Sequence, residues 1–450
     1  MVGVVGVFST TIRTVNHRSL SQKGEQNVVA EPYAKRPKPS TYATPPEYAH
    51  LTTGGCMELI RMILGGLLVI GVWGAVHYYL GRHLVGTLTR TRHAARIAWG
   101  VIALHGVLAP ILMMIRRGMP QGVWYHALNF VVYTGMGFVA LLFVLFVVRD
   151  LSAWAARRWV HKVVDEDRRA FLTSSFNLGA FVTTGVATGV GLHNAIKVPD
   201  VKEVEVLVPR LAPGLDGLRV AQLSDLHIGP TLRGKWLEAV VERTNSLGAD
   251  LVAITGDLVD ARVSDMGHEV ASLGQLKSTY GTFFVTGNHD YYWNGPEWVE
   301  HVESLGVRAL INSHALIERQ GGRLLVGGVT DLRTGRMAAG HSTDPFKAIA
   351  NAPQHDFSLL LAHQPGSVYD AAKAGWKMQI SGHTHGGQFF PWNFVVGIVH
   401  EFYAGLGKHL DTLIYVSRGT GFWGPPNRTV APSEITLLTL KSAGTEPAST

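Results

Sequence analysis

The sequence has almost no cysteine. Cys56 is the single cysteine among 450 residues, so one chain can form neither an internal disulfide nor a zinc site built on several thiolates. Charged residues are also scarce, at 16% of the chain against 46% hydrophobic residues. This balance indicates a protein that contacts a membrane.

A basic excess is missing from the second half of the chain. Of the 40 Lys and Arg and 33 Asp and Glu, 19 and 8 lie within residues 1–196, which leaves 21 basic against 25 acidic residues in 197–450. Proteins that bind nucleic acids usually carry a basic excess, because they neutralise phosphates. No nucleic acid partner is therefore expected.

Charge is absent from four long apolar segments. Each has about 20 residues, the length that a helix needs to cross a bilayer: 62–81, 97–115, 124–148 and 170–196. We expect residues 58–196 to form an all-α transmembrane region of about four helices, with Trp124 and Tyr125 as an interfacial aromatic anchor. Buried helices of a soluble domain are the alternative, and the Gly-, Ala- and Thr-rich fourth segment fits a membrane helix least well.

The polar residues 1–57 are expected to be a disordered leader. Met57 leaves open that they are an overextended gene start. Residues 444–450 are expected to be a short tail.

The loops between the apolar segments differ in charge. Ten basic residues lie in the first and third loops and two in the second: Arg82, Arg90, Arg92, Arg96, Arg149, Arg157, Arg158, Lys162, Arg168 and Arg169, against Arg116 and Arg117. Basic loops stay in the cytoplasm, so four spans predict a multi-pass protein of the cell membrane with an extracytoplasmic C-terminal half. Three spans would leave that half inside.

The pair Arg168-Arg169 has two interpretations. It is followed by Phe171-Leu172 and a weakly hydrophobic segment rich in Gly and Ala, which resembles a twin-arginine export signal. Alternatively, the two arginines only fix the orientation of a membrane helix. Both interpretations place the pair in the cytoplasm.

Short apolar runs alternate with amphipathic stretches after Ile196. Strands are predicted at LRVAQLSD, ADLVAITGD, GTFFVTGN, FSLLLAH and MQISGH, and helices near 234–247, 294–305 and 366–374. This alternation is typical of an α/β domain, which we expect to occupy residues 197–443.

Each predicted strand ends in residues able to bind metal or carry a proton. They are Asp225, His227, Asp257, Asn288, His289, Asp290, His363, His383 and His385. Taken alone, a pair such as His383-x-His385 is more often ordinary loop histidine than a metal site. The carboxyl ends of strands in an α/β sheet line one crevice, however, so five such motifs in series indicate a shared site.

The order D-x-H, G-D, G-N-H-D, H and G-H-x-H resembles the calcineurin-like metallophosphoesterase family. The segments GHTHGGQ and SRGTGFWGPPNR, residues 382–388 and 417–428, resemble its membrane-associated bacterial branch. The similarity covers about residues 203–440. It implies a four-layer α/β/β/α sandwich, two sheets between helical layers, and two divalent metal ions.

The resemblance also implies roles for single residues. His289 matches the catalytic histidine of the family, and Asp290 matches the acid that orients it. Asp257 would bridge the two metals. The first metal would also be held by Asp225, His227 and His385, and the second by Asn288, His363 and His383.

The donor types independently favour a transition metal. Imidazole, carboxylate and amide groups suit Mn, Fe or Zn, and the histidines are too many for Ca or Mg. Such a site suits hydrolysis of a phosphomonoester, phosphodiester or pyrophosphate, and membrane tethering favours a lipid-linked or envelope substrate. The alternatives are a soluble nucleotide substrate, or a catalytically silent sensor or scaffold that binds a phosphate ligand.

Three further features of the sequence are weaker indications of function. GPTLRGK at 229–235 is rejected as a phosphate-binding loop, because Trp236 replaces the required Ser or Thr. Arg418 and Arg428 could contact the phosphate or leaving group or lie in solvent. The aromatics after the last metal motif are core residues by default, or else an apolar lip for a lipid chain: Phe389, Phe390, Trp392, Phe394, Phe422 and Trp423.

Overall fold

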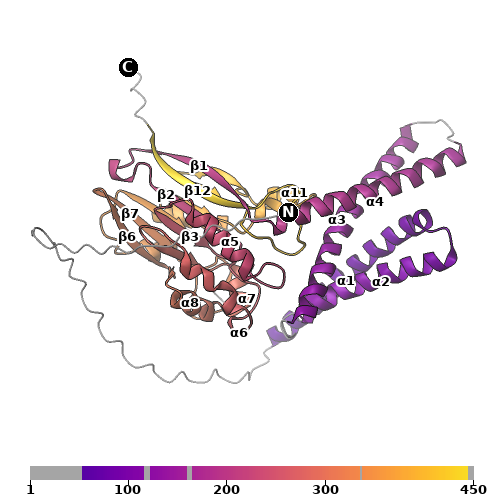
Figure 1. Ribbon diagram of the computed structural model, residues 1–450, viewed down its shortest axis with the longest axis horizontal. Coiled ribbons are helices and arrows are strands. Elements are labelled where there is room, and N and C mark those ends of the chain that lie inside the picture. The colour runs from indigo at the N-terminus through magenta and orange to yellow at the C-terminus, as the bar shows by residue number, and fades with distance from the viewer. Residues whose placement is uncertain (1–52, 116–121, 160–164, 335–336, 444–450) are drawn as a thin grey trace, which may run out of the picture. The chain divides into compact units, whose positions relative to one another are not determined.

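The computed structural model describes residues 53–115, 122–159, 165–334 and 337–443 (Figure 1). The expected leader and tail lie almost entirely outside these residues. Contacts divide the chain into two units, Met1–Arg61 and Met62–Thr450. The second unit holds the strands and the site described below.

Four long helices open the described chain. They are α1 Thr53–Leu88, α2 Arg92–Ile115, α3 Val123–Trp159 and α4 Glu166–Ile196. Each contains a stretch that is long and apolar enough to cross a membrane. These stretches are Leu64–Leu88, Arg92–Ile115, Val123–Arg158 and Glu166–Ile196. The helices extend beyond the four predicted apolar segments, because their polar ends continue the same backbone hydrogen bonding.

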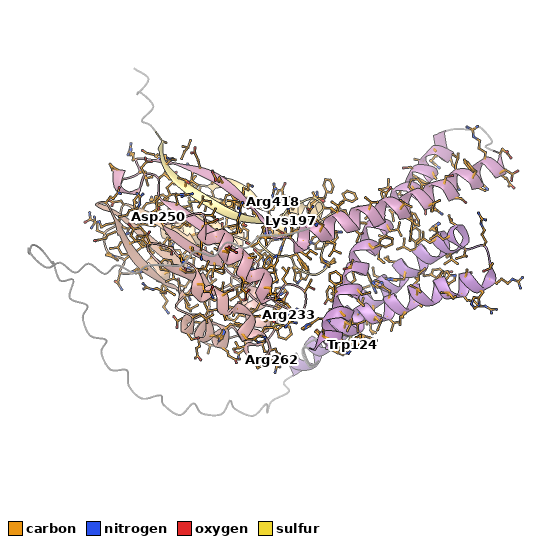
Figure 2. All side chains as sticks on the ribbon, in the orientation of Figure 1. Trp124, Lys197, Arg233, Asp250, Arg262 and Arg418 are labelled. Carbon is orange, nitrogen blue, oxygen red and sulfur yellow. The ribbon has the colours of Figure 1, made fainter. Side chains whose placement is uncertain are left out.

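The two residues of the expected aromatic anchor differ in their exposure. Trp124 is 86% exposed, as an interfacial residue must be (Figure 2). Tyr125 is only 7% exposed. Tyr125 therefore faces protein and does not serve as an anchor.

Two six-stranded sheets follow. The first has the order β1-β12-β2-β3-β4-β5 and the second β10-β11-β9-β8-β7-β6. The first consists of β1 Asp200–Pro209, β2 Arg219–Leu223, β3 Leu251–Thr255, β4 Thr282–Val285, β5 Arg308–Ala309 and β12 Glu434–Ala443. The second consists of β6 Ser313–Arg319, β7 Gly322–Gly328, β8 Phe357–Leu361, β9 Met378–Ser381, β10 Gly405–His409 and β11 Thr412–Val416.

Most neighbouring strands are parallel. In the first sheet β2 to β5 run parallel, whereas β12 is antiparallel to β2 and parallel to β1. In the second sheet β7, β8, β9 and β11 run parallel, and β6 and β10 are antiparallel edge strands. The carboxyl ends of β2, β3 and β4, and those of β8 and β9, therefore lie at one edge of each sheet.

Short helices connect the strands. The α-helices are α5 Gly234–Asn245, α6 Val263–Met266, α7 Asn288–Tyr292, α8 Gly295–Ser304, α9 Pro345–Ile349, α10 Val368–Ala374 and α11 Trp392–Val399. The 3-10 helices are η1 Pro213–Leu215, η2 Gly267–Gln275, η4 Pro365–Ser367 and η5 His385–Gly387. The five predicted strands correspond to β2, β3, β4, β8 and β9, and the three predicted helices to α5, α8 and α10.

Three hydrophobic cores lie between the four layers of the domain, which are two sheets and the helices on their outer faces. Val220 and Leu251 of the first sheet pack with Leu359 and Ile380 of the second in the core between the sheets. Their chain neighbours point the other way: Ala221 and Val252 pack beneath α5 and α8, and Leu360 packs beneath α9 and α10. Side chains alternate between the two faces of a strand, so strands buried on both faces join two cores. The α/β/β/α sandwich is confirmed.

Candidate metal centre

The predicted site residues follow the carboxyl ends of five strands, and their backbone is unusual. Five of the seven expected ligands have a positive φ: Asp225 (54°), His227 (46°), Asp257 (50°), His383 (72°) and His385 (52°). Such left-handed conformations are uncommon outside glycine and cost on the order of 1–3 kcal/mol each. They turn side chains from both sheets toward a common point.

The first group of candidate ligands is Asp225, His227 and His385, whose ligand atoms lie within 4.8 Å of one another. Nε2 of His227 and Nε2 of His385 are 3.2 Å apart, and Nε2 of His385 is 3.3 Å from Oδ1 of Asp225. Nδ1 of His227 donates to Asp260 at 3.1 Å. Because Nδ1 keeps the proton, Nε2 of His227 presents its lone pair to a metal.

The second group is Asp257, His363 and His383, again within 4.8 Å of one another. Nε2 of His363 lies 3.2 Å from Oδ2 of Asp257 and 3.2 Å from Nδ1 of His383. Nδ1 of His363 donates to the carbonyl oxygen of Thr255 at 2.9 Å. Nε2 of His363 is therefore the nitrogen available to a metal.

Asp257 faces both groups. Its Oδ2 is 3.2 Å from Nε2 of His363 in the second group and 3.7 Å from Nε2 of His227 in the first. Its Oδ1 accepts the backbone N–H of His289 at 2.8 Å, which fixes the plane of the carboxylate.

Asn288 supplies an independent test of whether a metal fits. Its side-chain oxygen Oδ1 is buried and has no hydrogen-bond partner among the described residues. A buried polar atom without a partner is costly unless another group satisfies it. Together with imidazole and carboxylate donors from two groups, this oxygen fits divalent transition-metal ions.

Burial and neighbouring charge shift the pKa values of the cluster in opposite directions. Complete burial raises the pKa of Asp225, and the nearby charge of Asp257 raises it further. Burial also acts to raise the pKa of Asp257, but the charges of His363 and His289 hold it well below its usual value. Burial and His363 lower the pKa of His383 to about 3. His383 is therefore neutral, as a metal ligand must be.

The ring of His289 contacts Asp260. Nδ1 of His289 lies 2.5 Å from Oδ1 of Asp260, whose other oxygen accepts from His227. The oxygens of Asp290 accept the backbone N–H groups of Asp257, Leu258, Val259 and Gly287. The role of Asp290 as the acid that orients His289 stays a prediction. Asp290 holds the two metal-binding loops together. Burial and Asp257 raise the pKa of Asp290 to about 7.

Two glycines make room for ligand carboxylates. A Cβ on Gly287 would overlap Oδ1 of Asp257, and a Cβ on Gly382 would overlap Oδ2 of Asp225 and Oγ of Ser224. Any larger residue would displace a carboxylate, so both positions require the absence of a side chain.

A pocket of about 280 Å³ opens onto this cluster. Its inner wall contains Asp257, Asn288, His289, His383 and His385, and its outer wall contains Tyr292, Trp392, Val396, His400 and Trp423. The aromatics of this region are mostly exposed: Phe394 is 60%, Trp392 47% and Trp423 42% exposed, whereas Phe422 is buried. The default prediction of core aromatics therefore holds for Phe422 and not for the three exposed residues.

Sequence reasoning missed the structural role of Arg428. Its side chain is fully buried and donates to the carbonyl oxygens of His385, Arg418, Ala431 and Gly421 and to Nδ1 of His385. It is therefore neither a solvated arginine nor a phosphate contact. Asp260 was also missed, although its place three residues after Asp257 in GDLVD is a usable signal.

The chain is similar to known proteins. Residues 218–387 match the family model described as Calcineurin-like phosphoesterase. A "Transmembrane protein with metallophosphoesterase domain" of Danio rerio is 34% identical over 405 residues, which are 85% of this chain and 89% of that protein. The protein of the same description in Bos taurus is 37% identical over 71% of this chain and 75% of its own length.

Bacterial relatives are present as well. A metallophosphoesterase of Campylobacter jejuni is 30% identical over 84% of this chain and 98% of its own length. The similarity thus extends across most of the chain in both animal and bacterial proteins. The chain belongs to the calcineurin-like metallophosphoesterase family, and it is a metal-dependent phosphoesterase.

Proposed function

We propose that this protein is a membrane-anchored phosphoesterase with a dinuclear metal centre. The observation that carries the proposal is the position of Asp257, whose Oδ2 faces His227 of one ligand group and His363 of the other. Asp225, His227, Asp257 and His385 would hold the first metal. Asp257, Asn288, His363 and His383 would hold the second. The donor set favours Mn, Fe or Zn.

Divalent metals in these positions would polarise the phosphoryl group and activate water for attack on phosphorus. The protein residues supply the proton chemistry. As the new phosphorus–oxygen bond forms, the ester P–O bond breaks, and protonated His289 gives its proton to the leaving oxygen. Asp260 holds the ring and stabilises its charged form, and the water proton is lost to solvent. The substrate is a phosphomonoester, phosphodiester or pyrophosphate.

We further propose that the catalytic domain is extracytoplasmic. Arg233 contacts Nδ1 of His126 in the first turns of α3 at 2.9 Å, and the backbone N–H of Arg428 donates to Gly191 near the end of α4 at 2.9 Å. These contacts support a domain on the side of the α2–α3 loop, which is the loop poor in basic residues. Arg168 and Arg169 lie in the first turn of α4, where they suit an orientation signal or a twin-arginine signal.

Tethering to the membrane favours a lipid-linked or envelope phosphate as substrate. The exposed apolar residues of α11 support this choice, since Ile398 is 86% exposed and Val399 67%. Both lie on α11, which also contributes Trp392 and Val396 to the metal pocket. An exposed apolar patch of this kind commonly marks a membrane or partner contact.

The test uses the full-length protein in lipid nanodiscs with Mn, Fe or Zn and chromogenic phosphomonoester and phosphodiester substrates. We expect metal-dependent hydrolysis. Asp257→Asn should lose bound metal and turnover together, whereas His289→Ala should keep the metal and lose roughly 100-fold or more in kcat.

The matched controls are Asp411→Asn and His268→Ala, whose side chains are 98% and 70% exposed. Both should behave as wild type. Metal binding without hydrolysis of any substrate would indicate a silent phosphate sensor. Equal metal loss in Asp257→Asn and His289→Ala would contradict the division of roles.

A further inference from the structure

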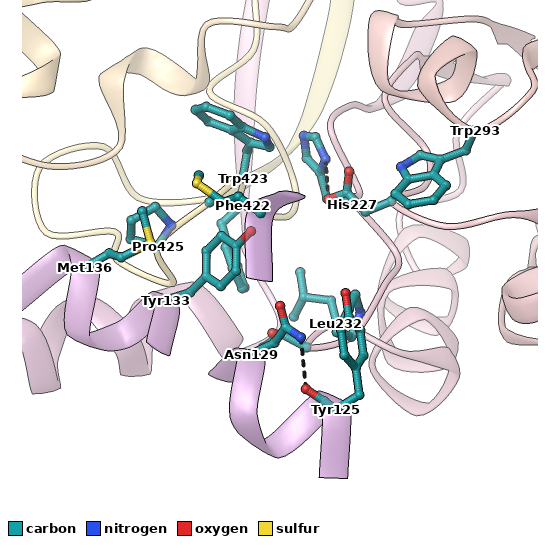
Figure 3. Close-up of a pocket in the computed structure, with 15 residues that line it drawn as sticks. Tyr125, Asn129, Tyr133, Met136, His227, Leu232, Trp293, Phe422, Trp423 and Pro425 are labelled. Atoms are coloured by element: carbon teal, nitrogen blue, oxygen red, sulfur yellow. Dashed lines mark hydrogen bonds and ion pairs between the residues drawn. The ribbon is translucent and has the colours of Figure 1, made fainter. Parts of the chain in front are cut away.

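A second pocket lies between α3 and the metal-binding loops (Figure 3). Its α3 wall consists of Tyr125, Asn129, Tyr133 and Met136, spaced four, four and three residues apart. This spacing places them on one face of the helix. Because α3 is long and apolar enough to cross a membrane, this wall of the pocket belongs to a candidate membrane helix.

The opposite wall is apolar and comes from the catalytic domain. It includes Leu232, Trp293, Phe422, Trp423 and Pro425, which Figure 3 shows around the same space as the α3 residues. The cavity volume is about 180 Å³. Aromatic rings and prolines offer large apolar surfaces, so this cavity suits a hydrocarbon and not a hydrated headgroup.

The polarity of the pocket changes toward the metal centre. His227 and Asp260 line its inner end, and they are the metal ligand and the partner of the catalytic histidine described above. Asp260 is the single residue with a full charge among the lining residues. Trp423 lines both this pocket and the metal pocket, so the two spaces share a wall.

The outer end of the pocket faces the bilayer. Met113, near the end of α2, lines the pocket and is 44% exposed. Its neighbour Met114 is 74% exposed on the same candidate membrane helix. The exposed methionines of α2 thus give the pocket an apolar rim on a candidate membrane helix.

We propose that this pocket binds the hydrocarbon chain of a lipid-linked phosphate ester while the phosphate occupies the metal pocket. The inference rests on the proposed phosphoesterase function and names the substrate class. The apolar walls from α3 and the loop 422–425 recognise the chain, and the metal centre recognises the phosphate.

The experiment compares butyl phosphate with hexadecyl phosphate on the full-length protein in nanodiscs. Because each methylene transferred to an apolar site contributes favourably, kcat/KM should be at least about tenfold higher for the hexadecyl ester. Met136→Trp, which fills the cavity from the α3 wall, should reduce this ratio toward one. Val131→Trp, on a residue of α3 that is 65% exposed, is the matched control and should keep the ratio of the wild type.

A binding measurement separates this inference from catalysis. A hexadecyl phosphate brominated along its chain should quench the fluorescence of Trp293 and Trp423, which line the cavity, and unlabelled hexadecyl phosphate should compete. The quenching should persist in Asp257→Asn, which lacks turnover, and should fall in Met136→Trp.

Each outcome decides a different point. Equal kcat/KM for the two esters, or quenching that is unchanged in Met136→Trp, would overturn the chain site while leaving the phosphoesterase function intact. Quenching without a chain-length effect on turnover would show a structural lipid and also overturn the proposal. Failure to hydrolyse either ester or the chromogenic substrates with every metal would instead refute the proposed function.

Discussion

Oδ1 of Asp260 lies 2.5 Å from Nδ1 of His289, so this carboxylate joins the proposed proton donor to the candidate metal centre. The other oxygen of Asp260 accepts from Nδ1 of His227 at 3.1 Å. One carboxylate therefore contacts both the candidate metal ligand His227 and the candidate catalytic residue His289. The charges of these two histidines outweigh burial and hold the pKa of Asp260 far below its usual value.

Asp260→Asn should affect substrates according to their leaving groups. An amide stabilises protonated His289 less well than a carboxylate does, so proton donation to the leaving oxygen should weaken. We expect kcat to fall about 100-fold for an alkyl phosphate, and much less for a nitrophenyl phosphate, whose leaving group needs no proton. Steady-state kinetics with both substrates measure this difference. An equal loss for both, with metal content reduced, would show that Asp260 acts only through His227.

Asn288→Leu should weaken one metal site selectively. Leucine has a similar volume but no oxygen to replace Oδ1 of Asn288, which is buried without a partner in the described structure. Even residues that only support the metal ligands change metal affinity roughly 10- to 100-fold. We therefore expect the second metal to bind at least tenfold more weakly, as measured by metal titration followed by elemental analysis. Asn288→Asp retains an oxygen and should retain two metals. Full metal content in Asn288→Leu would exclude Asn288 as a ligand.

Gly382→Ala should disturb the Asp225 carboxylate. The added Cβ would overlap Oδ2 of Asp225 and Oγ of Ser224, both of which are buried. Overpacking of this kind costs about 1–3 kcal/mol, so the melting temperature and metal content should both fall. Gly397→Ala is the matched control, because its nearest neighbour is an atom of Tyr403 at 3.8 Å. A normal metal content in Gly382→Ala would mean that Asp225 tolerates displacement.

Reporter fusions should report the orientation of the membrane region. A reporter that is active only outside the cytoplasm, fused after Thr450, should be active, and the same reporter fused after Trp159 should be inactive. The reason is the ten basic residues of the first and third loops against two in the second. The reverse pattern would place the catalytic domain in the cytoplasm and remove the argument for an envelope substrate.

The sequence by itself determined the strands that carry the site and the candidate ligands that follow them. Runs such as LVAIT and LRVAQL are mostly apolar, and Asp, Asn and His residues at the ends of such runs are rare. The length of the uncharged apolar segments also located four helices long enough to span a membrane, which the structure contains. These features depend on neighbours along the chain, and local patterns are sufficient to read them.

Only the tertiary structure brought Asp260 beside the ring of His289. Asp260 and Asp290 both lie close to the motifs in sequence, and neither position says where the carboxylate points. The left-handed backbone at Asp257 and the turn into α7 direct Asp290 to four backbone N–H groups and leave Asp260 beside His289. Likewise, β12 reaches β1 and β2 from more than two hundred residues away. Contacts over such separations follow from packing, which no local pattern encodes.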